Sequence, residues 1–151
     1  MKYLVVLFGA LWLAACGAAE TTRPDFRTAL DAHLAAIAAK DFDAYKPTVT
    51  SGEDLHLIFP DGSVIETTQG VFDFHEEWFA DSNWRMDPDV VKVMEGEDMA
   101  AALLKYDYRD TPEGDPRASW LILVFGLENG QWRLIHDQNT RIIQQTSSED
   151  V

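Results

Sequence analysis

The histidine and amide side chains near the C-terminal end of the chain are the first candidates for chemistry. Residues 131–143 alternate in polarity as a half-buried β-strand does, and regular alternation places Trp132, Leu134, His136, Gln138 and Thr140 on one face. This face runs from an indole to polar groups, as the wall of a pocket would. A histidine there can act as general acid or base near neutral pH. We predict His136 as the catalytic candidate; the alternative is a hydrogen-bonded histidine that closes the bottom of a core.

A carboxylate partner for this chemistry is harder to place from the sequence. Alternation turns Asp137 to the face opposite the histidine, which disfavours a simple His-Asp dyad. Tyr106 and Tyr108 share one face of another predicted strand and could supply a phenol to a developing oxyanion. Asp107 alternates away from both of them. No carboxylate is therefore predicted beside the two phenols, which counts against isomerase chemistry.

The predicted pocket lining is rich in aromatic and imidazole side chains, each of which could equally belong to the core. Such a lining favours a flat or apolar ligand. Its predicted members are Tyr45, His56, His75, Trp78, Tyr106, Tyr108, Trp120, His136 and Gln138. The four histidines of the chain lie on separate predicted elements with no short-spaced pair, so we expect no metal site, and no motif points to a cofactor.

The first fifteen residues have the layout of a secretory signal. Lys2 supplies a positive start, and residues 4–13 form an apolar run that is shorter than the ~20 residues of a membrane-spanning helix. The run ends in Leu13-Ala14-Ala15-Cys16, which resembles a bacterial lipobox. This resemblance implies cleavage before Cys16 and a diacylated cysteine, hence a lipid anchor in a membrane. An ordinary signal peptide that happens to contain a cysteine is the alternative.

The resemblance also suggests an address in the cell envelope. Gly17 is not the aspartate of an inner-membrane retention signal, so we expect a periplasmic protein anchored to the outer membrane. Residues 16–24 are small and polar, as in a flexible tether that follows the lipidated cysteine. Because the chain has a single cysteine, an internal disulfide is excluded.

The chain is strongly acidic. Its 12 basic and 26 acidic residues give a net charge of −14, and removing Lys2 with the signal leaves 11 against 26, or −15. Such a surface repels phosphate backbones, which argues against nucleic acid as a partner.

The remaining sequence predicts one domain over residues 25–143 and a polar tail over 144–151. Its first helix is capped by Asp25, and His33 lies at the edge of the apolar stripe, where we expect it to be exposed. A strand over residues 120–126 is apolar at every position, so both of its faces should be covered. The predicted helices are 25–39, 41–45 and 70–80, and the predicted strands are 55–59, 63–68, 84–94 (interrupted near Pro88), 99–109, 120–126 and 131–143.

The order of these elements is similar to that of the nuclear transport factor 2-like superfamily and its SnoaL-like and ketosteroid isomerase-like group. The residues that carry the resemblance are the alanine-rich first helix, Asp41-Phe42-Asp43, Thr68-Gln69-Gly70 before a helix with Trp78-Phe79, and the run from Gly130 to Asp137. It implies an α+β, cystatin-like fold. A curved antiparallel sheet would form a cone-shaped half-barrel with about three helices on its concave face, and homodimers through the other face.

The superfamily includes isomerases, dehydratases, cyclases, ligand binders and assembly domains, so the fold does not select an activity. We expect a lipid-anchored periplasmic domain that binds a small apolar or amphipathic molecule in its cone. One alternative is an enzyme that uses His136 for acid-base chemistry. The other is a dimeric accessory or assembly lipoprotein, because the outer face of the 120–125 strand needs a cover.

Overall fold

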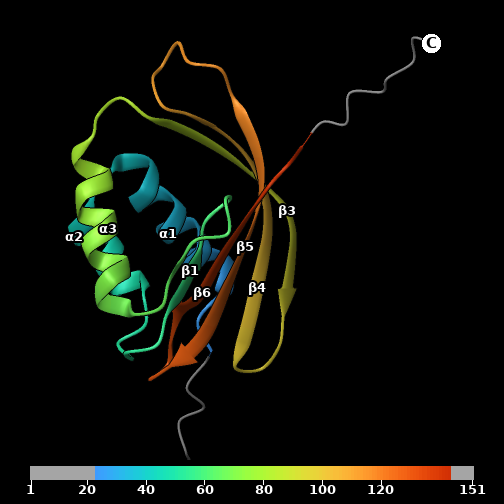
Figure 1. Cartoon of the computed structure of the whole chain (residues 1–151). Helices are drawn as coiled ribbons and strands as arrows, with labels where there is room; N and C mark the ends of the chain where they lie inside the picture. The colour runs from blue at the N-terminus through green and yellow to red at the C-terminus, as the bar shows by residue number, and fades with distance from the viewer. Residues whose placement is uncertain (1–22, 144–151) are drawn as a thin grey trace, which may run out of the picture.

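The computed structural model describes residues 23–143 and builds from them an α+β domain (Figure 1). The helices are α1 (Phe26–Ala39), α2 (Phe42–Tyr45) and α3 (Thr68–Ala80), and a short 3-10 turn, η1 (Lys46–Thr48), follows α2. The strands are β1 (His56–Ile58), β2 (Val64–Ile65), β3 (Arg85–Glu95), β4 (Met99–Arg109), β5 (Arg117–Glu128) and β6 (Gln131–Arg141). The predicted signal peptide, the Cys16 anchor, most of the tether and the polar tail lie outside the described residues.

Side-chain caps begin the three helices. Asp25, Asp41 and Thr67 each accept a hydrogen bond from the backbone N–H three residues further on, at 2.7–3.1 Å. These bonds satisfy N–H groups that have no partner within the helix. The first two starts were predicted; α3 begins at Thr68, earlier than the predicted start at Gly70, because Thr67 caps it.

The sheet has the strand order β2-β1-β6-β5-β4-β3, and the helices lie on one side of its curved surface (Figure 1). The predicted bounds of β4 are confirmed. The predicted break at Pro88 is wrong, since Pro88 stays in register opposite Tyr106. β3 is an edge strand, where a residue without an N–H does not remove a hydrogen bond from the ladder. The irregularity falls instead between Val90 and Lys92.

One strand pair departs from the predicted antiparallel sheet. β1 pairs with β2 antiparallel but with β6 in parallel, with His56 opposite His136 and Ile58 opposite Gln138. α3 and four strands separate β1 from β6 in the chain, so no tight hairpin dictates their relative direction. The sheet is therefore mixed, within the cone fold that was predicted.

A one-residue bulge in β6 decides which side chains face the helices. Val124 is opposite His136, but the next pair is Phe125 opposite Leu134, so Ile135 is the extra residue. An extra residue shifts the two-residue period by one and moves every later side chain to the other face. Leu134 is buried before the bulge, and Asp137 is buried after it. The predicted alternation is thus correct up to Leu134 and reversed beyond it.

His33 belongs to the core, so its predicted exposure is wrong. Its side chain is 0% exposed, and its Nδ1 lies 2.8 Å from the Thr48 hydroxyl oxygen. That hydroxyl donates its own hydrogen to the Tyr45 carbonyl at 2.6 Å, so His33 is the donor to Thr48. The physical reason is helical spacing: His33 follows Leu30 by three residues on the buried stripe of α1.

Tyr45 provides a stability test in the same core. Its hydroxyl is buried and has no hydrogen-bond partner among residues 23–143. An unsatisfied buried hydroxyl costs roughly 1–3 kcal/mol. We therefore expect Tyr45→Phe to leave the free energy of unfolding unchanged or to raise it by about 1 kcal/mol in urea titrations.

Tyr106→Phe is the matched control, because the Tyr106 hydroxyl donates to Asn139 Oδ1 at 2.8 Å. That substitution removes a satisfied hydrogen bond and should lower the free energy of unfolding by about 1 kcal/mol. Equal losses in the two variants would contradict the assignment of the Tyr45 hydroxyl as unsatisfied.

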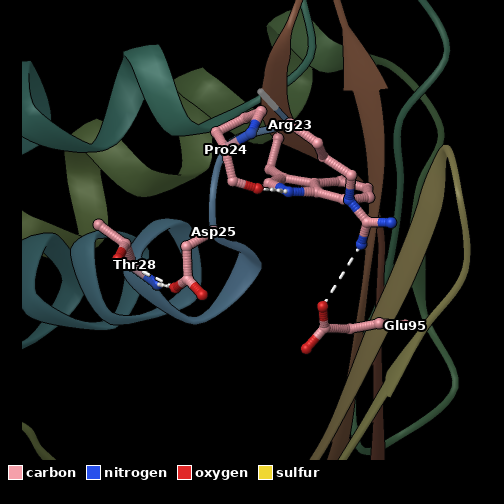
Figure 2. Close-up of polar contacts among 6 residues, drawn as sticks. Arg23, Pro24, Asp25, Thr28 and Glu95 are labelled. Carbon is pink, nitrogen blue, oxygen red and sulfur yellow. Dashed lines mark hydrogen bonds and ion pairs between the residues drawn. The ribbon is translucent and has the colours of Figure 1, made fainter. Parts of the chain in front are cut away.

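The first described residues are fixed to one end of the sheet (Figure 2). The Arg23 guanidinium pairs with Glu95 at 3.3 Å and lies 4.7 Å from the centre of the Trp132 ring. The Trp132 indole N–H donates to the Pro24 carbonyl at 2.9 Å. The chain therefore enters the domain where β3 ends and β6 begins.

Candidate functional site

A cavity of about 270 Å³ lies between α3 and the inner face of the sheet. Most of its wall is apolar or aromatic, and its volume is slightly below the roughly 300–1,000 Å³ of ordinary small-molecule pockets. The lining residues are Ile37, Leu57, Phe59, Pro60, Phe74, His75, Trp78, Met86, Tyr106, Tyr108, Arg117, Ser119, Leu121, Asp137, Asn139 and Arg141. Among the described residues, this is the place where polar side chains from β4, β5 and β6 converge with the aromatic face of α3.

A hydrogen-bonded chain of three side chains forms the polar wall of the cavity. The Tyr106 hydroxyl donates to Asn139 Oδ1 at 2.8 Å, and Asn139 Nδ2 donates to Asp137 Oδ1 at 2.8 Å. The same Nδ2 also donates to the Ile58 carbonyl at 3.0 Å. The amide of Asn139 is therefore fully oriented, and it fixes the carboxyl of Asp137 against the apolar cavity.

The Asp137 carboxyl has an unusually high pKa. Its side chain is buried, and burial raises its pKa to about 7, against a smaller lowering by the hydrogen bond from Asn139. Removing a carboxylate from water disfavours its charged form, which accounts for the direction of this shift. At neutral pH the group is thus present in both protonation states, as a general acid or base requires.

His75 contributes a neutral imidazole to the wall. Burial lowers its pKa to about 4, although a hydrogen bond with the Val71 carbonyl opposes this change. Its Nδ1 lies 2.8 Å from that carbonyl oxygen, so Nδ1 carries the hydrogen and Nε2 is an acceptor. The ring stacks on Tyr45 at 4.2 Å between centres. His75 can accept a hydrogen bond from a ligand but is not protonated near neutral pH.

The aromatic wall is built from stacked rings, and it leaves the Tyr108 phenol free to donate a hydrogen bond. Trp78 stacks on Trp84 at 4.1 Å, and Trp84 stacks on Tyr108 at 6.2 Å between ring centres. The Trp78 indole N–H donates to the Tyr108 hydroxyl oxygen at 3.2 Å. Because that oxygen accepts from Trp78, its own hydrogen is available to a ligand in the cavity.

The structure brings four of the predicted pocket residues together: His75, Trp78, Tyr106 and Tyr108 all line the cavity. Tyr45 lies behind the wall, in the core against His75. His56 is exposed on β1, because its neighbour Leu57 takes the inward position.

The other three predicted pocket residues lie on the outer face of the sheet. Trp120, His136 and Gln138 alternate with the lining residues Leu121, Asp137 and Asn139, and their cross-strand partners are Thr140, Val124 and Ile122. The prediction that placed His136 and Gln138 in the cavity is wrong, because it assumed regular alternation across Ile135. The bulge there substitutes Asp137 and Asn139 for them.

His136 gives a direct check of this inverted face. We expect His136→Gln to change the affinity of any cavity ligand by less than about twofold, because the side chain lies across the sheet from the cavity. The measurement is a fluorescence titration with an apolar dye. His75→Gln, on the cavity wall, is the matched control and should weaken binding. A large effect of His136→Gln alone would contradict the register of β6.

Sequence reasoning missed the polar lining residues Ser119, Asp137, Asn139, Arg117 and Arg141. The polar run 136–141 was recognised as one side of a pocket wall, but the wrong alternate members of it were selected. A bulge with no glycine or proline leaves no local signal, so only the pairing with β5 shows it.

No group of three or more potential metal ligands converges anywhere in residues 23–143. Within the same residues, the helices are all too short or too polar to cross a membrane.

The fold agrees with comparisons to known proteins. The model of the SnoaL-like domain family matches residues 27–142, most of the chain, so this protein belongs to the SnoaL-like domain family. No curated protein matches it.

Solved structures show the same fold at low sequence identity. A proposed calcium/calmodulin-dependent protein kinase type II association domain from Thiobacillus denitrificans has a TM-score of 0.69 at 19% identity, over 80% of this chain and 97% of that chain. A proposed dehydratase of the NTF2-like family from Streptomyces avermitilis has a TM-score of 0.68 at 14% identity, over 79% of this chain and 94% of that chain. A cystatin-like domain of unknown function from Nostoc punctiforme has a TM-score of 0.65 at 16% identity, over 80% of this chain and 76% of that chain. The predicted NTF2-like and cystatin-like fold is confirmed.

Proposed function

We propose that this domain binds a small, flat, apolar or amphipathic molecule in the cavity between α3 and the sheet. The observation that carries this proposal is a cavity of about 270 Å³ whose aromatic wall faces one fully oriented polar group, the Asn139-Asp137 pair. An apolar wall supplies affinity by burial, and a few fixed polar groups select the orientation of the ligand.

A blocking substitution tests the proposal. Met86 is half-buried on the edge strand β3 and lines the cavity, so Met86→Trp adds an indole to the cavity with little strain on the core. We expect it to weaken binding of the apolar dye phenylnaphthylamine about tenfold or more. Val91→Trp, at a 54% exposed position on the same strand, is the control. Equal affinity in all three proteins would show that the dye does not enter the cavity.

An acid-base enzyme is the second candidate, with Asp137 in the role that the sequence analysis gave to His136. The buried carboxyl with a pKa near 7 is the observation that favours it. As the carboxylate, Asp137 would take a proton from a carbon next to a ligand carbonyl. The free hydrogen of Tyr108 would stabilise the enolate oxygen, and the protonated Asp137 would then return the proton to another carbon. The similarity to a proposed dehydratase is consistent with such a site.

Deuterium uptake tests this chemistry. An unsaturated bicyclic ketone incubated with the protein in heavy water should exchange its α-hydrogens. The rate should rise with pH through about 7, as Asp137 loses its proton. Asp137→Asn should abolish the exchange, and His136→Gln should not affect it. Binding of the ketone without any exchange would leave the domain as a binder alone.

For the location of the protein, we propose a lipid anchor on Cys16 in the periplasmic leaflet of the outer membrane. Cys16 precedes Arg23 by seven residues, which span at most about 25 Å. Arg23 is held at the end of the sheet near Glu95 and Trp132 (Figure 2). The exposed lining residue Arg141 lies at the other end of β6, so the anchor would leave that end of the cavity directed away from the membrane.

Radioactive palmitate tests this anchor. The wild-type chain should be labelled in growing bacteria, and Cys16→Ser should not. Labelling that persists in Cys16→Ser, or no labelling of the wild type, would contradict lipidation at this residue.

We also propose that two copies pair through the outer face of β5. The side chain of Trp120 is 38% exposed, and Ile122 and Val124 beside it are only half-buried in the single chain. The predicted cover of this apolar face is therefore absent from the described residues of one chain. Light scattering on the chain from Gly17 onward should give a dimer mass, and Trp120→Arg should give a monomer. A monomeric wild type would contradict the pairing.

A further inference from the structure

Arg141 is the exposed cationic member of the cavity wall. The bulge at Ile135 places it on the inner face of β6, in line with Asp137 and Asn139, and it lies opposite Ser119 of β5. All three of its inner-face neighbours also line the cavity. The inner side of β6 therefore runs from a buried carboxyl, through a half-buried amide, to a solvent-exposed guanidinium.

The guanidinium of Arg141 is free in the part of the chain that the structure describes. The other cavity arginine, Arg117, donates a hydrogen bond from each terminal nitrogen to the Asp110 carboxylate, and its guanidinium lies 5.3 Å from the centre of the Tyr108 ring. Arg141 makes no ion pair and no side-chain hydrogen bond within residues 23–143. Asp61 and Asp110 are near enough to interact with its charge, but neither comes within ion-pair distance. Its planar set of N–H donors is thus available to a ligand.

The charge of the cavity contrasts with that of the whole protein. The chain carries −14, yet the lining holds two arginines against one carboxyl, and that carboxyl is partly protonated at neutral pH. The positive charge of a cation at the rim of an apolar cavity attracts anions to that site. The acidic surface elsewhere on the protein repels them.

We propose that the ligand of this cavity is an amphipathic anion, an apolar ring system that carries a carboxylate, sulfonate or phosphate bound by Arg141. The apolar body lies against Trp78 and the inner sheet, and a neutral hydrogen-bonding group points toward Asp137. Asp137 and Arg141 are four positions apart on the strand, or about 13 Å, which suits a molecule of two or three fused rings. The inference rests on the proposed binding function and adds the chemical class of the ligand.

Two dyes with the same ring skeleton separate this inference from the binding function itself. Anilinonaphthalene sulfonate carries an anionic group, and phenylnaphthylamine is its neutral counterpart. Both are titrated into purified protein by fluorescence, with wild type, Arg141→Gln, Arg141→Lys and Arg27→Gln compared. Arg27 is exposed on α1 away from the cavity, so Arg27→Gln makes the same change in net charge without touching the rim.

We expect Arg141→Gln to weaken the sulfonate about tenfold and the neutral dye by less than about twofold, because a charge-assisted contact is lost. Arg27→Gln should match wild type. Arg141→Lys should fall between, since a point charge replaces the guanidinium fork. In about 1 M salt, wild type and Arg141→Gln should converge for the sulfonate.

Equal effects of Arg141→Gln on the two dyes, or no effect on the sulfonate while both dyes bind, would overturn the anion assignment and leave the binding function standing. If neither dye binds the wild-type protein, the proposed function fails and this inference fails with it. Should Arg141→Gln lose its cooperative thermal transition, the Arg141→Lys and salt comparisons decide the question.

Discussion

Replacing Asp137 with Asn is expected to raise the free energy of unfolding by about 2–4 kcal/mol above neutral pH. Burial raises the pKa of Asp137 to about 7, from 3.8 for an ordinary aspartate. A carboxyl whose pKa is raised in the folded state makes its full contribution to the free energy of unfolding below about pH 4. This contribution is lost as the pH rises from about 4 through 7, at about 1.4 kcal/mol per pH unit. Asn keeps the acceptor for Asn139 Nδ2 and carries no charge at any pH.

The pH dependence of this gain identifies its cause. Urea titrations of the wild type and Asp137→Asn should differ most at about pH 8 and converge at about pH 4, where the wild-type carboxyl is protonated. Asp31→Asn, exposed on α1, removes one negative charge elsewhere and corrects for the net charge. If Asp137→Asn is less stable than wild type at both pH values, Asp137 is not a buried carboxyl with a raised pKa. If Asp137→Asn has the higher free energy of unfolding, the native Asp137 is retained at a cost in stability, as functional residues often are.

Acidification is expected to destabilise the wild-type domain through His33 and His75. Burial lowers the pKa of His33 to about 3 and that of His75 to about 4, from 6.5 for an ordinary histidine. A histidine with a lowered pKa gives its full stability above pH 6.5 and loses it as the pH falls toward the folded-state value. The limiting loss is about 5 kcal/mol for His33 and about 3 kcal/mol for His75. Protonation of Asp137 opposes this loss between about pH 7 and 4.

Two variants separate these opposing contributions. His33→Asn keeps a donor to Thr48, so it should be less stable than wild type at neutral pH, because ring packing is lost, yet lose less on acidification. His56→Asn, at an exposed position, should follow the wild-type curve. When Asp137 is also replaced by Asn, the free energy of unfolding should fall by a few kcal/mol more on acidification, because the opposing protonation of Asp137 no longer occurs. An unchanged acid curve for His33→Asn would contradict the burial of a neutral imidazole.

The local features of this protein can be predicted from its sequence. Hydrophobic periods and capping residues defined α1, α2 and β4. Asn129 at φ 50° and Gly130 at φ 76° form the hairpin turn between β5 and β6, as an Asn-Gly pair between two strands favours. The order of these elements was sufficient to predict the SnoaL-like family and the cone fold. Such features depend on residues that are close together in the chain, which is why the sequence alone determines them.

Which side chains meet in the cavity depends on contacts between distant parts of the chain. The bulge at Ile135 depends on pairing between β5 and β6, and it exchanges His136 for Asp137 at the site. Helical spacing places His33 on the buried stripe of α1, but the rings of Tyr45 and Phe125 that cover it belong to other elements. The parallel contact of β1 with β6 joins segments that are eighty residues apart, as with His56 and His136. These contacts are long-range, and a shift of one residue inverts a strand face, so the local sequence pattern could predict a pocket wall but not its chemistry.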